Sequence, residues 1–398
     1  MDFNDSPAEA AFRAEARAFL DTYAPIGGLG QIYDDGHDES EFVKRSVEWQ
    51  GLLYDHGWAA ITWPEAYGGR GLGIVDQIIW NQELARAGFG TSIFVVGIGM
   101  AGPTIIAHGA EAHKERFLRP MLKGEEIWCQ LFSEPGAGSD LAGLACRAVR
   151  DGDHWIVTGQ KTWSSGAHYA DYGILLARTD PDLPKHKGIS YFLVDMRSPG
   201  IDVRPLQQMT GDSHFSEVFF EDVRIPHASM IAVEGAGWMC AMTTLMNERM
   251  AIGGGEGVVR FDQLVALARA RGGSLDAVTR DEMARVYTWA RCLEFMNARM
   301  LTKMSRGENP MAEASVMKLA MARLTTAGAD LGMKLLGTDS LIGEGAWIYK
   351  YLFAPALHIA GGTDEVQKNI AAETVLGLPK EPRIDKDVPF KEVPRGVA

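Results

Sequence analysis

The chain has 398 residues, a formal net charge of −13 and 46% hydrophobic residues. This length predicts two or three domains around a sizeable core, and the acidic balance argues against nucleic acid as a partner, because polyphosphate binding needs a basic face. The N-terminal region lacks the apolar segment of a secretory signal, and no run approaches the roughly 20 apolar residues of a membrane span. We therefore expect a cytoplasmic protein with no membrane span.

The four cysteines carry neither metal-binding nor redox spacing, which indicates ordinary thiols in a reducing compartment. They are Cys129, Cys146, Cys240 and Cys292. His108 and His113 lie five residues apart, off the i, i+4 spacing of two zinc ligands on one helix face. The sequence therefore predicts no metal site.

Apolar residues recur with helical spacing from residue 7 to about residue 125. Positions i, i+4, i+7, i+8 and i+11 fall on one helix face. The first such face consists of Phe12, Ala16, Phe19, Leu20 and Tyr23. We expect a helical N-terminal domain over residues 1–127.

The pattern changes to short strands between residues 128 and 232. Asp151-Gly152-Asp153 is typical of a hairpin turn between two apolar runs. Further apolar β runs lie at 174–177, 189–194 and 218–220. These runs predict a small middle β-domain over residues 128–233, of the barrel or sandwich type.

The helical period returns from residue 236 to residue 378 and predicts a C-terminal helical domain over residues 234–378. One predicted face holds Trp238, Met242, Leu245 and Arg249, and a later helix holds Val316, Leu319 and Leu331. Residues 379–398 carry prolines among charges and are predicted to form an extended or disordered tail. The predicted fold class is α+β.

Two polar runs flank the predicted hairpin. Residues 131–140 read Leu-Phe-Ser-Glu-Pro-Gly-Ala-Gly-Ser-Asp, and residues 159–165 read Gly-Gln-Lys-Thr-Trp-Ser-Ser. The first run offers a hydroxyl and backbone donors at a tight turn, and the second places an indole beside two hydroxyls. This combination suits a flat, polar heteroaromatic ring. A Gly-rich turn alone is an ordinary loop with local capping, and this one is not the G-x-G-x-x-G dinucleotide fingerprint.

At this spacing the two runs resemble the flavin-binding segments of the acyl-CoA dehydrogenase family. Four more runs stand in the family's order, at 58–71, 117–125, 220–226 and 361–367, so the resemblance covers roughly residues 10–378. It implies an N-terminal helical domain, a middle β-domain and a C-terminal four-helix bundle, with FAD between the β-domain and the C-terminal helices. It also implies assembly as a homo-oligomer, a dimer or a tetramer.

The family's reaction is the α,β-dehydrogenation of an acyl-CoA thioester. A carboxylate takes the α-proton, hydrogen-bond donors polarise the thioester carbonyl, and a flavin accepts the β-hydride, because no side chain accepts hydride. The resemblance implies FAD as the cofactor, acyl-CoA as the substrate, and electron-transfer flavoprotein or a similar acceptor as the electron partner. An acyl-CoA oxidase of similar fold is an alternative.

The resemblance also assigns roles to single residues. Trp163 packs against the isoalloxazine, and Ser165 bonds near its N5. Ser133 and the backbone of Leu131 and Phe132 serve the pyrimidine edge, and Ser139 lies near the thioester and pantetheine. Thr363 and Glu365 approach the adenosine half of FAD. Gly138 and Ser164 belong to the same cofactor-binding runs.

The catalytic base departs from the commonest family pattern. Straight-chain members carry it in a Tyr-Glu-Gly-Thr run, whereas the matching run here is Ala360 to Thr363, with Gly361 at the base position. A second branch, including isovaleryl- and long-chain-type enzymes, uses a Leu-x-x-Glu-Arg context, which Leu245 to Arg249 match. Glu248 is therefore the predicted base, and desolvation among apolar neighbours raises a carboxyl pKa toward the working range of a base.

Three further assignments and one alternative follow from this placement. The N–H of Gly361 is predicted to donate to the thioester carbonyl, and Arg249 to lie toward the CoA nucleotide. Asp364 and Glu365 are the nearest rival carboxylates. Alternatively, Glu248 is an ordinary surface glutamate paired with a neighbouring cation.

A second departure concerns the adenine half of the cofactor site. The family's Arg-x-x-Phe-Gly run is replaced over residues 268–275, and its Gly-Gly-containing run is replaced over residues 334–339. The site is therefore altered, or a different partner chain completes it. This leaves open that the chain is a non-catalytic or half-site subunit of a hetero-oligomer.

Overall fold

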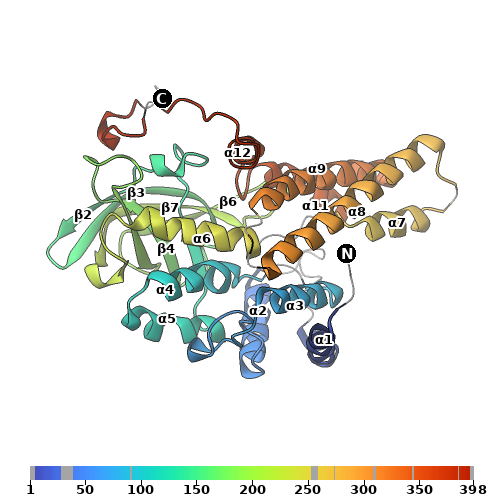
Figure 1. The fold of residues 1–398 in the computed structure, drawn as a ribbon, viewed down its shortest axis with the longest axis horizontal. Helices are drawn as coiled ribbons and strands as arrows, with labels where there is room; N and C mark the ends of the chain where they lie inside the picture. The colour runs from blue at the N-terminus through green and yellow to red at the C-terminus, as the bar shows by residue number, and fades with distance from the viewer. Residues whose placement is uncertain are drawn as a thin grey trace. The chain divides into compact units, whose positions relative to one another are not determined.

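The computed structural model describes residues 5–27, 39–89, 92–251, 259–272, 274–306, 308, 311–342, 345–383 and 385–394. These residues form two compact units. The helical unit draws on residues 1–42, 72–91 and 252–380, and the sheet unit on residues 43–71, 92–251 and 381–398. Along the chain, helices come before and after a strand-rich middle region (Figure 1). The predicted α+β class is therefore confirmed.

The helical unit is built on two long helices, α8 and α9, that pack along each other (Figure 1). Its core includes Leu264, Val286, Leu324 and Leu331. Its helices are α1 (Pro7–Gly27), α3 (Ile74–Arg86), α7 (Phe261–Ala270), α8 (Ala277–Ser305), α9 (Met311–Leu336), α10 (Asp339–Ile342), α11 (Ala346–Phe353) and α12 (Asp364–Ile370), with the short turns η6 (Ala354–His358) and η7 (Ala371–Val375).

The predicted apolar face of the first helix is confirmed. Phe12, Ala16, Phe19 and Leu20 of α1 are buried. The ring centroids of Phe19 and Trp80 on α3 lie 6.1 Å apart. The α1–α3 pair therefore forms through the side chains that the helical period selects.

A buried carboxylate crosslinks the same two helices. Glu83 of α3 is 2% exposed, and it accepts from Arg17 Nη2 at 2.9 Å, Arg86 Nε at 2.7 Å and Arg13 Nη1 at 3.2 Å. The hydrogen bond from Arg17, together with those from Arg86 and Arg13, outweighs burial and lowers the pKa of Glu83 from 4.5 to about 2.

This shift gives a pH-dependent stability. Because the folded pKa is depressed, the stabilisation is complete above about pH 4.5 and is lost as the pH falls toward 2. We expect Glu83→Gln to lower the free energy of unfolding at pH 7 by up to about 3 kcal/mol, and by less in high salt, because Arg17 and Arg86 are partly exposed. Denaturant titrations of both proteins should show the gap closing between pH 4.5 and 2. A gap independent of pH contradicts the assignment.

The sheet unit holds one eight-stranded sheet among the described residues. The strand order is β6-β7-β3-β2-β4-β5-β8, and β1 pairs in parallel with β4. The strands are β1 (Trp128–Leu131), β2 (Arg147–Asp151), β3 (His154–Ser165), β4 (Tyr172–Arg178), β5 (Ile189–Asp195), β6 (Ile201–Leu206), β7 (Phe215–Pro226) and β8 (Met230–Ile231). The predicted hairpin is β2–β3, where Asp151 pairs with His154 and Gly152 takes φ 62°.

Helices cover this sheet through a shared core. Tyr191 and Ile174 from the sheet, Met100 and Leu118 from the N-terminal helices, and Cys240 all belong to one buried cluster. The helices and turns of this unit are α2 (Glu39–Asp55, of which residues 43–55 belong here), η2 (Glu65–Tyr67), η3 (Gly97–Ala101), α4 (Gly102–His108), α5 (Glu111–Lys123), η4 (Leu141–Gly143), η5 (His227–Ser229), α6 (Gly237–Ala251) and η8 (Phe390–Glu392).

The predicted buried face of α6 is partly wrong. Met242 is 37% exposed, whereas Cys240, Ala241 and Thr244 are fully buried. Small residues face inward because α6 approaches β5 closely: a Cβ added at Gly237 lies 2.6 Å from the carbonyl carbon of Ser190. Close packing, rather than the largest side chains, therefore determines which side of α6 is buried.

The described tail residues pack on the sheet unit. Phe390 is 5% exposed, and the guanidinium carbon of Arg178 lies 3.7 Å from the centroid of its ring. Lys185, in the loop between β4 and β5, bonds the carboxylates of Asp385 at 2.5 Å and Asp140 at 2.8 Å. The tail is thus connected through one lysine to the turn that contains Asp140.

Among the described residues, none of the helices has the length and apolar character of a membrane span.

Candidate active site

Trp163 is presented to solvent by an irregular stretch of β3. Its side chain is 61% exposed, its φ is 58°, and the pairing of β3 with β7 shifts register between Lys161 and Ser164. A non-glycine residue in the left-handed region stores strain that usually marks a functional position. Phe215 supports the indole edge-on, with ring centroids 5.9 Å apart.

The two predicted cofactor-binding runs meet at this irregular stretch. The N–H of Thr162 donates to the carbonyl of Ser133 at 2.9 Å. The ammonium of Lys161 donates to the carbonyl of Phe132 at 3.1 Å. The segment carrying Trp163 therefore lies directly beside the segment carrying Ser133.

A buried ion pair holds the two runs together. Lys161 is fully buried and bonds Glu134 Oε1 at 2.7 Å. The Glu134 carboxylate also accepts from the N–H groups of Ala145 at 2.7 Å and Cys146 at 2.9 Å. A buried charge pair is tolerated when its remaining lone pairs are satisfied in this way.

The predicted polar groups of the site differ in exposure. Ser133 is half-buried, and Gly138, Ser139 and Ser165 are exposed. Leu131 and Phe132 are buried, which leaves their backbone as the part that serves a ligand. Ser164 points inward, with its Oγ buried and without a hydrogen-bond partner among the described residues. A contact between Ser164 and a cofactor would therefore come from its backbone.

These residues fit a flavin ring. The exposed indole offers an apolar face, Ser165 lies two residues along the same strand, and the run containing Ser133 lies alongside through the Thr162 hydrogen bond. Aromatic faces stack on flat rings, and hydroxyl and amide groups bond their polar edges. The sheet unit alone therefore supplies both kinds of contact.

Glu248 lies on the last turn of α6 in the same unit. Its carboxylate is half-buried, and its Oε2 lies 3.4 Å from the Nε2 of Gln130 on β1. β1 leads directly into the run that carries Ser133. The side chain of the neighbouring Arg249 lies outside the described part of the structure.

The remaining predicted residues belong to the helical unit. Gly361 takes φ 64°, and Thr363 caps the N-terminus of α12 by accepting from the N–H of Val366. Glu365 is 78% exposed in its side chain. This turn therefore places Gly361 and Thr363 directly before a helix N-terminus.

Asp364 is held in a network of its own. It accepts from His358 Nδ1 at 2.8 Å and lies 3.4 Å from Lys318 Nζ. Burial raises the pKa of Asp364, but the hydrogen bond and charge of His358 and the charge of Lys318 outweigh it, so the net pKa is lowered. A carboxylate with a lowered pKa is a weak base near neutral pH.

The two runs that depart from the family pattern are in contact. Arg271 donates to the carbonyl of Leu335 and pairs with Asp339 at 3.5 Å. Gly337, between them, takes φ 63°. The arginine that replaces part of the family motif is thus bonded within its own chain.

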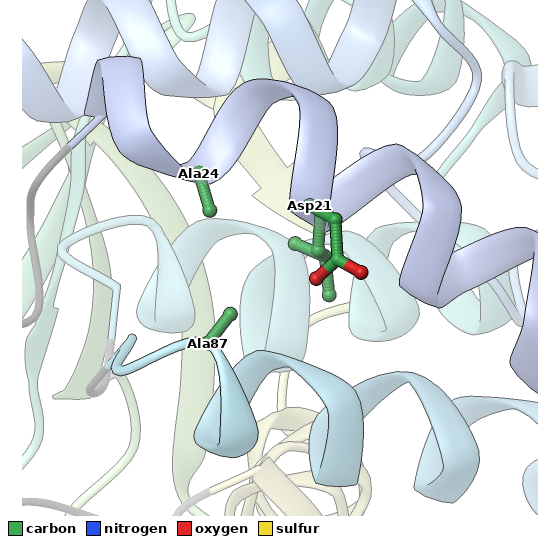
Figure 2. A pocket seen from close by; sticks show the side chains of 4 residues that line it. Asp21, Ala24 and Ala87 are labelled. Atoms are coloured by element: carbon green, nitrogen blue, oxygen red, sulfur yellow. The ribbon is translucent and has the colours of Figure 1, made fainter.

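A pocket in the helical unit is separate from every predicted site residue. Leu20, Asp21 and Ala24 of α1 line it together with Ala87, which follows α3. Figure 2 shows Asp21 and Ala24 facing Ala87 across the space.

The described residues contain no group of His, Cys, Asp and Glu side chains arranged to hold a metal ion. His108 instead bonds Thr243, and His113 bonds the carbonyl of Ala228.

Family models cover nearly the whole chain. The acyl-CoA dehydrogenase N-terminal, middle and C-terminal domains match residues 6–125, 129–223 and 235–376. The chain belongs to the acyl-CoA dehydrogenase family, a family of oxidoreductases. The family resemblance predicted from the sequence is therefore confirmed.

Relatives from Mycobacterium tuberculosis include two proteins with high identity to this chain. Acyl-CoA dehydrogenase FadE34 is 43% identical over 332 residues, which is 83% of this chain; the chain spans about half, 46%, of the length of FadE34. Acyl-CoA dehydrogenase IpdE1 is 37% identical, covering 93% of this chain and 98% of IpdE1.

Solved structures match almost the full length of the chain. The Tcur3481-Tcur3483 steroid ACAD is 30% identical with a TM-score of 0.84, covering 96% of this chain and 100% of the matched chain. The ChsE4-ChsE5 complex from Mycobacterium tuberculosis is 30% identical with a TM-score of 0.79 and the same coverage.

Reasoning from the sequence missed the residues that support the site. Lys161 and Glu134 lie inside the two runs that were recognised, and a period-two reading of β3 places Lys161 on the same inward face as Trp155 and Val157. That signal was present in the sequence. Gln130 carries no such signal, because its contact with Glu248 joins residues 118 positions apart.

Proposed function

We propose that this chain catalyses the FAD-dependent α,β-dehydrogenation of an acyl-CoA thioester, with Glu248 as the acceptor of the α-proton. The observation that supports the proposal is Trp163, which has an exposed side chain and a left-handed backbone conformation and lies beside the segment that contains Ser133. Bound flavin supplies the acceptor for the β-hydride. Membership of the acyl-CoA dehydrogenase family supports the reaction class.

Glu248 is the carboxylate that fits the base best. It is half-buried, its Oε2 lies 3.4 Å from the Nε2 of Gln130, and it stands in the Leu-x-x-Glu-Arg context of residues 245–249. Asp364 is engaged by His358 and Lys318, and Glu365 is largely exposed. In the proposed reaction Glu248 removes the α-proton, and the family resemblance assigns the N–H of Gly361 and the chain around Ser139 to the thioester end of the substrate.

The decisive experiment is anaerobic bleaching of the bound flavin by a panel of acyl-CoAs. Loss of flavin absorbance on adding one acyl-CoA, with formation of the enoyl-CoA, supports the proposal. A yellow protein that no acyl-CoA bleaches argues against it. Rapid reoxidation of the bleached flavin by oxygen indicates an acyl-CoA oxidase, and slow reoxidation indicates a dehydrogenase that uses electron-transfer flavoprotein or a similar acceptor.

Trp163→Ala is expected to weaken FAD retention about tenfold or more, because the stacking face is lost. The apoprotein should keep its stability, because the indole is 61% exposed. Trp163→Phe, which keeps an aromatic face, is the matched control and should retain most of the FAD. Equilibrium dialysis with FAD measures both variants, and unchanged affinity in Trp163→Ala contradicts the proposed cofactor site.

We propose that the acyl group is steroid-derived. The likeness to the Tcur3481-Tcur3483 steroid ACAD along almost the full chain supports this class. A panel that contains a steroid side-chain acyl-CoA beside straight-chain and branched acyl-CoAs tests it. Faster bleaching by a straight-chain acyl-CoA than by the steroid compound refutes this substrate class and leaves the proposed reaction intact.

We also propose that a second, related chain completes the assembly. The likeness to the ChsE4-ChsE5 complex supports this, as do the internally bonded Arg271 and the exposed apolar side chains of the helical unit. Those side chains include Tyr287, Trp289, Phe295, Leu341 and Ile342.

The chain purified alone is therefore expected to be FAD-poor, and its co-purified complex with the partner to be FAD-replete. Light scattering and flavin absorbance measure both states. An FAD-replete, active homo-oligomer of this chain alone would instead confirm the family's simpler arrangement. A colourless protein with every related chain tested would identify a non-catalytic subunit.

A further inference from the structure

Gln130 is a polar side chain of the sheet that reaches Glu248. It lies on β1 between Cys129 and Leu131, which are both fully buried, and it is itself half-buried. Its Nε2 lies 3.4 Å from Glu248 Oε2. An ionised carboxylate only accepts hydrogen bonds, so the amide N–H₂ is the group that faces it.

The helix that carries Glu248 is anchored one turn earlier. Thr244 is fully buried, and its Oγ1 lies 2.8 Å from Thr104 Oγ1 and 3.1 Å from the hydroxyl of Tyr191. Thr243 bonds His108 at 2.8 Å. These contacts fix the backbone of α6 against α4 and β5, but none of them fixes the rotamer of the Glu248 side chain.

We propose that Gln130 is the positioning residue of the proton-abstracting carboxylate: its amide orients Glu248 and stabilises its ionised form. This inference rests on the proposed function, in which Glu248 takes the α-proton. β1 continues into the run that carries Ser133, so the same strand orients the base and supplies part of the proposed flavin site. One short strand thus contacts the proposed base and leads into the proposed flavin site.

Three titratable side chains on the neighbouring elements are kept neutral by burial. Burial raises the pKa of Cys240 on α6 to about 11 and that of Cys129 on β1 to about 12, and burial also raises the pKa of Tyr191 on β5. His108 on α4 bonds Thr243, five residues before Glu248. The amide of Gln130 therefore adjusts the proton affinity of Glu248 without adding a charge.

A donor to the charged form of a carboxyl favours ionisation, and a nearby like charge opposes it. Gln130→Leu removes the donor, so we expect the acid limb of the kcat/KM profile against pH to move up by about 0.5 to 1 unit. Gln130→Glu places a second carboxyl beside Glu248 and should move it up by about 1 to 2 units. In Gln130→Leu, kcat should fall about three- to tenfold, because the carboxylate loses its orientation, with KM changed less than about twofold.

Two further variants separate positioning from simple structural damage. Gln130→Asn keeps an amide on a shorter side chain, and it should recover part of the acid-limb position. Thr104→Val breaks the buried hydroxyl contact beneath α6, and it should lower the melting temperature without moving the acid limb. Flavin content and circular dichroism identify any variant that does not fold.

Glu248→Gln measured in parallel distinguishes the possible failures. If Glu248→Gln is inactive and the two Gln130 variants move the acid limb upward, the proposal stands. If Glu248→Gln is inactive but Gln130→Leu and Gln130→Glu keep the wild-type acid limb, Gln130 has no positioning role, and the proposed function is unaffected. If Glu248→Gln stays active, Glu248 is not the base, and the proposed role of Gln130 is wrong as well.

Discussion

Glu248→Gln is expected to abolish acyl-CoA-dependent flavin bleaching while the protein keeps its fold and its flavin spectrum. The amide is nearly isosteric with the carboxylate but does not accept the α-proton. Loss of a general base costs about 10²–10⁴-fold in rate. The effect should be at the upper end of this range, because the reaction does not proceed until the α-proton leaves.

Stopped-flow reduction under anaerobic conditions measures this effect, with FAD content determined for each variant. Glu365→Gln is the comparison variant: its side chain is 78% exposed, and it should act through FAD affinity and leave the bleaching rate of FAD-saturated protein near that of the wild type. Asp364→Asn removes the acceptor of His358 and should act through the local structure of the helical unit. Near-normal bleaching by Glu248→Gln contradicts the assignment, and lost bleaching by Asp364→Asn with FAD still bound moves the role to Asp364.

Gly361→Glu extends this test, because it places a carboxylate where the straight-chain branch carries its base. A Cβ at Gly361 meets nothing within 4 Å, but φ 64° strains any side chain there by about 1 kcal/mol. We expect the double variant Gly361→Glu with Glu248→Gln to recover part of the bleaching rate. No recovery, with the fold and FAD intact, would show that the two positions do not serve one α-carbon in this chain.

The sequence predicted most secondary structure, because periodicity reports which side of an element is buried. Phe12, Ala16, Phe19 and Leu20 gave the buried face of α1. The Gly152 turn gave the β2–β3 hairpin. Both features are local, and each depends on residues within one or two turns of chain.

The exposure of Trp163 was not readable from the same periodicity. Alternate positions along β3 face the interior, and they carry Trp155, Val157 and Lys161. The same alternation would place Trp163 inward as well. The register shift before Ser164 reverses this alternation, so Trp163 faces solvent and Ser164 faces the interior. A bulge depends on the partner strand β7, and the sequence of β3 alone does not contain that information.

The family resemblance assigns the proposed base to Glu248, but it gives no sign of the side chain that we propose orients it. Gln130 and Glu248 are 118 residues apart, and their contact exists only because α6 packs on the sheet. Small residues permit that packing, whereas the helical period of the sequence points to the large side chains of Trp238 and Met242. Long-range polar contacts of this kind follow from tertiary packing and not from local pattern.

Lys161→Met is expected to destabilise the sheet unit by about 3–5 kcal/mol, because it leaves the Glu134 carboxylate buried without a counter-charge. Glu134 keeps the N–H groups of Ala145 and Cys146, but two neutral donors do not replace an ammonium at 2.7 Å. Denaturant unfolding of the apoprotein measures the loss. FAD affinity should also fall, because Lys161 bonds the carbonyl of Phe132 in the proposed flavin site.

Two control variants test whether the unpaired buried charge causes the loss of stability. Lys391→Met breaks an exposed pair with Asp182, and it should leave the stability nearly unchanged, because exposed ion pairs contribute little. The double variant Lys161→Met with Glu134→Gln removes both charges and should recover much of the stability, because a neutral pair carries a smaller desolvation penalty. If the double variant also recovers FAD binding, neutral side chains at positions 134 and 161 are sufficient to hold the two runs together. If stability returns and FAD binding does not, the lysine is needed for the geometry of the cofactor site itself. Wild-type stability in Lys161→Met would contradict the stabilising role of the Lys161–Glu134 pair.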